Sequence, residues 1–211
     1  MTMNSTPKIF DTHAHYDDEA FDPDREAVIA SLREHGIGAV VNVGANRAGT
    51  EHSLELAQKY DFFYGAAGVH PSDTMEFENG TVSISWLREI ASQPKMLAIG
   101  EIGLDYYWDT PDRSIQKKWF LEQLALAKEL EKPVIIHSRN AAKDTLDLIR
   151  EGYRVALVTD CIDSRDPLNK ERTILRLAQE GVVITTYESV LYELLGSAKA
   201  PEFKAISAIV K

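Results

Sequence analysis

Short apolar runs alternate with amphipathic segments along the whole chain. The runs have the length and composition of buried strands, and between them apolar residues recur near helical spacing. We predict strands at 9–15, 37–43, 62–70, 96–102, 133–137, 154–160 and 182–186. We predict helices at 22–36, 50–59, 84–92, 110–130, 141–150, 166–181, 188–195 and 201–210.

Strands that are apolar throughout and alternate with helices indicate a parallel sheet covered by helices. Right-handed crossovers then allow a (β/α) barrel or an open, doubly wound, three-layer sheet. We expect one α/β domain over residues 1–211, TIM-barrel-like, with about seven strands. Because eight strands usually close such a barrel, we expect incomplete closure. The doubly wound sheet is the alternative, and an open sheet edge favours a homodimer.

Composition narrows the class of protein. The 211 residues are 44% hydrophobic, and no run of about 18 apolar residues occurs, so we expect no membrane span. The net charge of −10 disfavours a protein that coats nucleic acid through a basic surface. The single Cys161 and an N-terminus without an apolar signal core predict a cytoplasmic protein.

Polar residues at the ends of the predicted strands carry the candidate chemistry. His13 and His15 share one face of the first strand, since residues i and i+2 point the same way. His70, Glu101 and His137 end the third, fourth and fifth strands. A lone histidine is more often a hydrogen-bonded structural residue than a ligand, but this set favours a metal site.

The donor types point to a divalent ion. Imidazole and carboxylate groups suit zinc, manganese or magnesium. A glutamate between two histidine groups could bridge two ions, which would stabilise the oxygens of a phosphodiester during hydrolysis. We therefore predict up to two divalent ions at this edge of the sheet.

Four motifs make the first two thirds of the chain resemble a known family. They are DTHAH, GVHP, GEIGLDYY and IIHSR, at 11–15, 68–71, 100–107 and 135–139. In this order they resemble the TatD family of metal-dependent deoxyribonucleases, which have an amidohydrolase-like barrel, over about residues 8–147. The resemblance implies that His13 and His15 bind one metal, that Glu101 bridges and is catalytic, and that His137 binds the second metal.

The same resemblance implies a substrate side to the site. His70, Asp105 and Tyr106 would line it, and Arg139 would contact a phosphate of DNA or another phosphodiester. The family's later ligands, a histidine on the sixth strand and an aspartate on the eighth, do not follow. No histidine occurs after His137, and Asp160 or Asp163 would have to substitute. We therefore expect an impaired hydrolase, with an inactive scaffold as the alternative.

Residues 148–211 resemble a second family. The segments 152–160, 164–167, 184–196 and 201–204 are similar to the C-terminal part of isochorismatase-like hydrolases. That family's catalytic residues lie upstream of such a segment, and Cys161 does not occupy the nucleophile's place, so its chemistry is not implied. A join within 141–152 would make the chain an engineered chimera.

Overall fold

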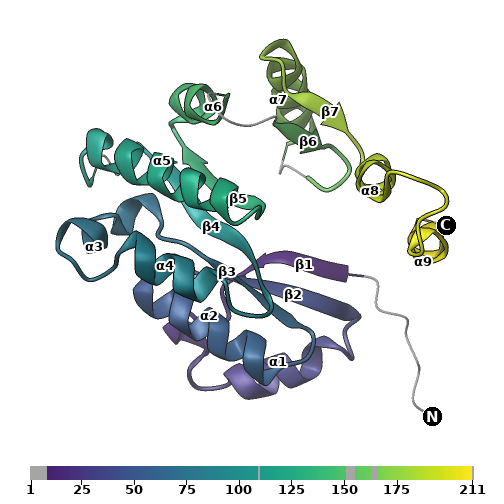
Figure 1. Cartoon of the computed structure of the whole chain (residues 1–211), viewed down its shortest axis with the longest axis horizontal. Coiled ribbons are helices and arrows are strands. Elements are labelled where there is room, and N and C mark those ends of the chain that lie inside the picture. The colour runs from purple at the N-terminus through teal and green to yellow at the C-terminus, as the bar shows by residue number, and fades with distance from the viewer. Residues whose placement is uncertain (1–8, 109, 151–154, 163–165, 211) are drawn as a thin grey trace. The chain divides into compact units, whose positions relative to one another are not determined.

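The computed structural model forms two compact units, residues 1–146 and 147–211, which divide within helix α6 (Ala142–Arg150) (Figure 1). Each unit is described by itself. The structure describes residues 9–108, 110–150, 155–162 and 166–210.

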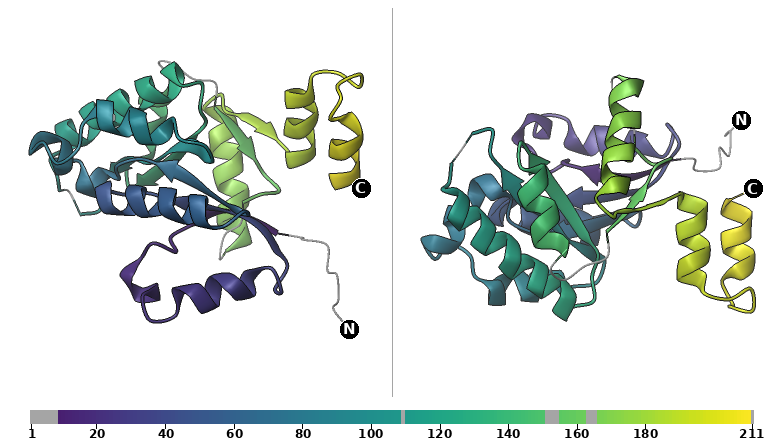
Figure 2. Two further views of the ribbon diagram at one scale, coloured as in Figure 1. Left: turned by 60° about the horizontal axis from the view of Figure 1, so that its bottom comes forward. Right: turned by 90° about the horizontal axis from the view of Figure 1, so that it is seen from above.

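The first unit is built on a parallel sheet of five strands that curls as a half-barrel (Figure 2). The strands follow the chain order without reversal. A doubly wound sheet reverses its strand order at a switch point, so the doubly wound alternative is wrong for this sheet. The strands are β1 (Ile9–Ala14), β2 (Ile37–Val43), β3 (Phe63–Ala67), β4 (Met96–Asp105) and β5 (Val134–Arg139).

The strand register places the fourth strand's polar residues at the C-terminal edge of the sheet. Ala67, the last residue of β3, lies opposite Ile99, so Glu101 lies two residues beyond the end of β3. Across the other neighbour, Gly103 lies opposite His137. β4 continues to Asp105, three residues further than the sequence predicted.

Helices of the first unit pack against the strands β2, β3 and β4 (Figure 1). Side-chain caps set two helix starts that differ from prediction. Asn46 accepts a hydrogen bond from the Gly49 N–H, so α2 begins before residue 50, and Asp112 accepts one from the Ser114 N–H, so α5 begins after Thr110. The helical segments are η1 (Glu19–Phe21), α1 (Arg25–Leu32), α2 (Arg47–Lys59), η2 (Pro71–Asp73), α3 (Met75–Glu78), α4 (Ile84–Ala91) and α5 (Arg113–Glu129).

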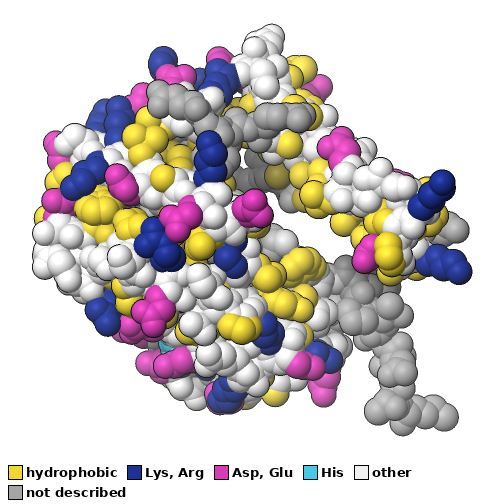
Figure 3. Space-filling model, in the orientation of Figure 1, with side chains coloured by type: hydrophobic (Ala, Val, Ile, Leu, Met, Phe, Trp, Pro, Cys, Tyr) yellow, Lys and Arg dark blue, Asp and Glu magenta, His cyan; other side chains and the backbone are white. Residues whose placement is uncertain are grey.

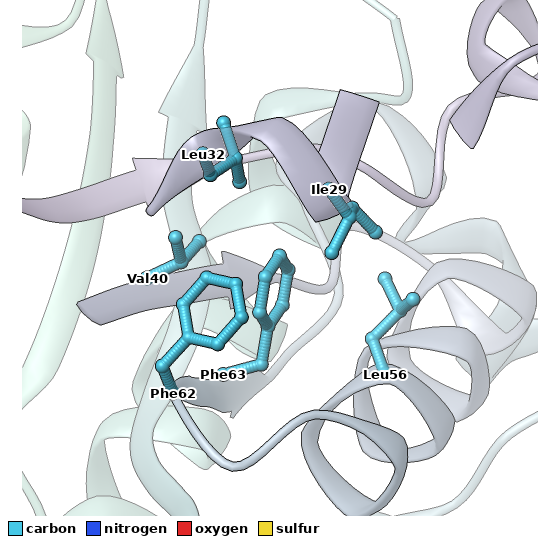
Figure 4. Close-up of a cluster of buried hydrophobic side chains, with 6 residues drawn as sticks. All are labelled: Ile29, Leu32, Val40, Leu56, Phe62 and Phe63. Carbon is cyan, nitrogen blue, oxygen red and sulfur yellow. The ribbon is translucent and has the colours of Figure 1, made fainter. Parts of the chain in front are cut away.

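Alternate residues of the strands enter two apolar layers, as the pleat requires. Val40 packs with a cluster that joins α1, α2 and β3, drawn in Figure 4. Its neighbour Val41 packs on the other face with Val43, Ala66 and Ala98. The first cluster consists of Ile29, Leu32, Val40, Leu56, Phe62 and Phe63.

The second unit holds a separate two-stranded parallel sheet. The expectation of about seven strands in one sheet is therefore not met among the described residues, where β6 pairs only with β7 through three residue pairs. The expected motif residues 152–154 and 163–165 lie outside the described residues. The elements are β6 (Ala156–Val158), α7 (Pro167–Gln179), β7 (Val183–Thr185), α8 (Tyr187–Leu195) and α9 (Phe203–Ile209).

The visible face of the protein mixes charges of both signs and shows no broad basic surface (Figure 3). No helix among the described residues has the length and apolar character needed to cross a membrane.

Candidate metal centre

The C-terminal edge of the five-stranded sheet gathers four of the six histidines around Glu101. His13 lies in β1 and His15 directly follows it. His137 lies in β5, and His70 caps η2, three residues beyond β3. Their ligand atoms form two groups, each within 4.8 Å across, and Glu101 belongs to both.

The first group joins His13 and His15 to one oxygen of Glu101. The two Nε2 atoms lie 3.1 Å apart. Glu101 Oε2 lies 3.5 Å from His13 Nε2 and 3.9 Å from His15 Nε2. Two imidazole nitrogens on one tetrahedral zinc ion are about 3.3 Å apart, from Zn–N bonds of about 2.0 Å. The nitrogen pair therefore fits a single ion.

The second group uses the other oxygen of the same carboxylate. Glu101 Oε1 lies 3.2 Å from His137 Nδ1, while His137 Nε2 lies 3.0 Å from Asp105 Oδ2. A metal-bound histidine commonly donates its other ring N–H to a carboxylate. His137 has this arrangement, with Nδ1 toward the centre and Nε2 held by Asp105.

The electrostatics of the centre favour a charged carboxylate. Burial opposes ionisation of Glu101, but hydrogen bonds from His13 and His137 outweigh it and hold its pKa well below the usual range. The same hydrogen bonds to Glu101 raise the pKa of His13 and of His137. A divalent cation would take the place of these protons, so the centre binds positive charge in either form.

His70 belongs to the second group with Glu101 and His137, where its ring is a hydrogen-bond donor. Its ring lies 4.2 Å from that of His137, centroid to centroid. Burial, with the neighbouring His137, lowers the pKa of His70 to about 4, so the ring is neutral at pH 7. Its Nδ1 accepts a hydrogen bond from the Ser72 N–H, which leaves the proton on Nε2.

Asp105 was expected to line the substrate side, but its side chain is buried. Its Oδ2 contacts His137 Nε2, and its Oδ1 accepts a hydrogen bond from the Tyr107 N–H. Burial raises the pKa of Asp105, but hydrogen bonds from the Tyr107 N–H and from His137 outweigh burial. The pKa therefore lies below its usual value, and the carboxyl group is anionic. The position at the end of a longer β4 turns this carboxylate toward His137.

Replacing Asp105 with asparagine should weaken metal binding without unfolding the protein. Loss of the charge behind His137 should raise the dissociation constant of an ion bound by His137 roughly 10- to 100-fold, as for other residues that orient a metal ligand. Calorimetric titration of the metal-free protein measures it. Asp61→Asn, which alters an exposed ion pair with Arg33, is the control. Equal affinities in both variants would show that Asp105 does not support His137.

Asn42, at the end of β2, is a positioning residue that the sequence did not reveal. Its side chain is fully buried and accepts a hydrogen bond from the Tyr16 N–H. It donates to Asp17 Oδ1 and to Ser53 Oγ. Asp17 Oδ1 in turn lies 4.0 Å from His15 Nδ1. Asn42 therefore fixes the segment that carries His15. One sign of this role is visible in the sequence, a polar residue inside an otherwise apolar strand.

Two buried glutamines of α5 hold the backbone next to the centre. Gln123 accepts a hydrogen bond from the Val69 N–H and donates to the Val69 carbonyl. Gln116 does the same for Asp105 and also donates to the Pro111 carbonyl. We call this pair the glutamine clamps. Because seven residues are about two helical turns, both side chains lie on one face of α5.

Replacing Gln116 with leucine should destabilise the protein by about 2 kcal/mol. The change leaves the Asp105 N–H and carbonyl buried without these partners, and one unsatisfied buried group costs roughly 1–3 kcal/mol. Urea denaturation measures the free energy of unfolding. Gln93→Leu, at a half-buried position, should cost roughly 0.5 kcal/mol or less. A similar loss in both variants would contradict the clamp.

The remaining candidates lie outside the metal-binding groups. The Tyr106 hydroxyl donates to Asp144 Oδ2, and the Arg139 guanidinium lies 3.8 Å from the centroid of the Tyr107 ring. Asp160 belongs to the second unit, where it accepts a hydrogen bond from the Tyr187 N–H. Cys161 is an exposed free thiol, and Asp163 lies outside the described residues.

Comparison with known proteins identifies relatives of this arrangement. The family model described as TatD related DNase matches residues 10–185. An uncharacterized metal-dependent hydrolase, YabD of Bacillus subtilis, is 40% identical over 143 residues, which cover 68% of this chain and 55% of YabD. The 3′-5′ ssDNA/RNA exonuclease TatD of Erwinia tasmaniensis is 35% identical over 143 residues, covering 67% and 54%. The chain thus spans about half the length of these curated relatives.

Solved structures support the same fold. YjjV, a TatD homologue from Escherichia coli K12, matches with a TM-score of 0.67 and 29% identity, over 83% of this chain and 66% of YjjV. A TatD family hydrolase from Entamoeba histolytica matches with a TM-score of 0.69 and 22% identity, over 86% and 66%. It supports the fold alone.

The family match extends well past the expected join within 141–152. The comparisons therefore do not support an isochorismatase-like C-terminal part or a chimera. Over the greater part of its length, and with the motifs that form the metal centre, the chain belongs to the TatD related DNase family.

Proposed function

We propose that the protein is a hydrolase of nucleic-acid phosphodiesters that uses two divalent ions held by His13, His15, Glu101 and His137. One observation carries the proposal: the two oxygens of the Glu101 carboxylate face two separate histidine groups. A carboxylate shared in this way suits a bridging ligand between two ions. If Glu101 were a purely structural acid, backbone N–H donors would be enough to hold it, and no histidines would be needed around it.

Each residue then has a distinct role. Two divalent ions in these groups would supply an activated water and neutralise the charge of a phosphodiester. Glu101 is the catalytic residue, because it would hold both ions at the reacting centre. His70 donates from Nε2 to a phosphate oxygen, and Asp105 positions the His137 ring. Arg139 provides a positive charge for the substrate phosphate.

The proposed substrate is DNA, in keeping with the family. The Erwinia tasmaniensis relative carries the name of an exonuclease for single-stranded DNA and RNA. The comparisons do not support the impaired activity that the sequence led us to expect. A homodimer belongs to the same proposal, because the outer edges of β1 and β5 have no strand partner among the described residues.

Metal titration tests the proposal directly. Adding Zn²⁺ or Mn²⁺ to the metal-free protein should fill two sites and raise the melting temperature, because a ligand that binds only the folded state stabilises it by about 2.7 kcal/mol at 100 times its dissociation constant. The loaded protein should then hydrolyse bis(p-nitrophenyl) phosphate and DNA. Binding of one ion or none, without hydrolysis, would overturn the two-ion proposal.

A further inference from the structure

Two aromatic side chains that follow β4 lie exposed beside the metal centre. Tyr107 is 53% exposed and Trp108 is 62% exposed. Their ring centroids lie 4.8 Å apart with an edge-to-face angle of 89°. The Arg139 guanidinium lies 3.8 Å from the Tyr107 centroid and 5.8 Å from that of Trp108. We call these three residues the aromatic platform.

The platform is fixed to the metal centre through two paired strands. Arg139 lies opposite Asp105 in the register of β4 and β5, and it lies two residues beyond His137. Two residues of a strand rise about 7 Å. The carboxylate that contacts His137 also accepts a hydrogen bond from the Tyr107 N–H. The platform therefore begins directly where the histidine groups end.

Packing does not account for the platform. A tryptophan more than half exposed leaves most of its apolar surface in water, so it adds little to the core. The other tryptophans, Trp86 and Trp119, are half-buried. Among the described residues, Arg139 makes no ion pair, and its guanidinium contacts the two rings. Its positive charge is thus available to an anion.

The chemistry of these groups matches an unpaired nucleotide. Bases of single strands stack on aromatic side chains and on arginine planes, while phosphates bind the guanidinium. In a duplex, neighbouring bases already cover both faces of each interior base, so these bases cannot stack on the platform. An abasic strand offers the phosphate but no ring to stack.

We propose that Tyr107, Trp108 and Arg139 bind an unpaired nucleotide next to the phosphodiester to be cleaved, with its base on Trp108 and a phosphate on Arg139. This inference rests on the proposed function and adds to it the residues that would bind the base and the phosphate of the substrate. It assigns the three residues to substrate binding and gives none of them a role in bond cleavage.

Binding without turnover tests the platform. The full chain in EDTA is titrated into a fluorescein-labelled oligothymidylate and into an abasic strand of equal length, and fluorescence anisotropy gives both dissociation constants. Oligothymidylate should bind about tenfold more tightly, the order expected for one stacked base. Trp108→Leu should bring the ratio of the two dissociation constants close to one. Trp108→Phe, which keeps an aromatic ring, should retain most of the wild-type ratio.

Matched variants separate stacking from charge and from folding. Trp86→Leu removes a tryptophan that contacts Arg47 on another surface, and it should leave the ratio unchanged. Arg139→Gln should weaken the binding of both strands by a similar factor. It should also reduce the salt dependence of the affinity, as the loss of a phosphate contact does. Thermal melting verifies that each variant is folded.

Separate outcomes distinguish this inference from the proposed function. Equal binding of both strands by the wild-type chain, or a ratio unchanged in Trp108→Leu, would overturn the platform even if the Mn²⁺-loaded protein cleaves DNA. Discrimination that depends on Trp108, without any cleavage by the loaded protein, would support the platform and refute the hydrolase. Preference for a blunt duplex over a single strand would also overturn it.

Discussion

On the proposed two-ion mechanism, replacing Glu101 with glutamine should abolish binding of both metal ions and all hydrolysis. Each Glu101 oxygen faces a different histidine group, so an amide leaves one weak oxygen donor and presents an N–H₂ group to the other ion. The loss of metal affinity should exceed the roughly 10- to 100-fold effect of replacing a residue that only orients a metal ligand. Metal content after dialysis, measured by atomic emission, gives the number of ions retained.

His13→Ala is the matched comparison for this result. His13 contacts only the first group, so its loss should release one ion and spare the one held by His137. Retention of two ions by Glu101→Gln would refute the bridging role. Loss of both ions from His13→Ala as well would mean that the two sites fill only together, which the count per protein reveals.

Gly103→Ala should prevent the protein from folding stably. Gly103 has a φ of 148°, which L-residues rarely adopt, and an added Cβ would lie 1.9 Å from the His137 carbonyl oxygen. The clash is with backbone, so β4 and β5 would have to separate between Glu101 and Asp105. We expect a loss of about 3 kcal/mol or more, the upper range for overpacking and backbone strain. Circular dichroism during thermal melting measures it.

Gly80→Ala provides the control for backbone conformation alone. Gly80 has a φ of 78°, but an added Cβ would meet nothing within 4 Å. Its cost should stay near 1 kcal/mol, which is typical of placing an L-residue in the left-handed region. Comparable losses in the two variants would show that strain, and not the contact with His137, determines the effect at Gly103.

The sequence predicted the parts of the site that follow from strand periodicity. His13 and His15 were expected on one face at the end of a strand, and Glu101 and His137 on others; the structure places all four at one sheet edge. The parallel, barrel-type sheet also followed from the apolar runs. Pairing of the later strands did not, because three-residue strands such as β6 carry almost no register information.

The residues that support the site were beyond sequence reasoning because their contacts are long-range. Gln116 and Gln123 occupy the buried face of α5 together with Phe120, where periodicity expects apolar residues. Their polarity was a signal, but their partners lie 11 and 54 residues away along the chain. The extension of β4 to Asp105 was equally hidden, since glycines at 100 and 103 interrupt the apolar run.

The glutamine clamps also have a consequence for the exchange of backbone hydrogens with solvent. Val69 follows the end of β3, and Asp105 is the last residue of β4, where amides ordinarily exchange through local fraying. Here each amide donates to a side chain of α5, so it can exchange only when the helix leaves the sheet. In deuterium oxide these two amides should therefore exchange as slowly as those within the buried strands, and the backbone of the metal centre should open only when the first unit unfolds.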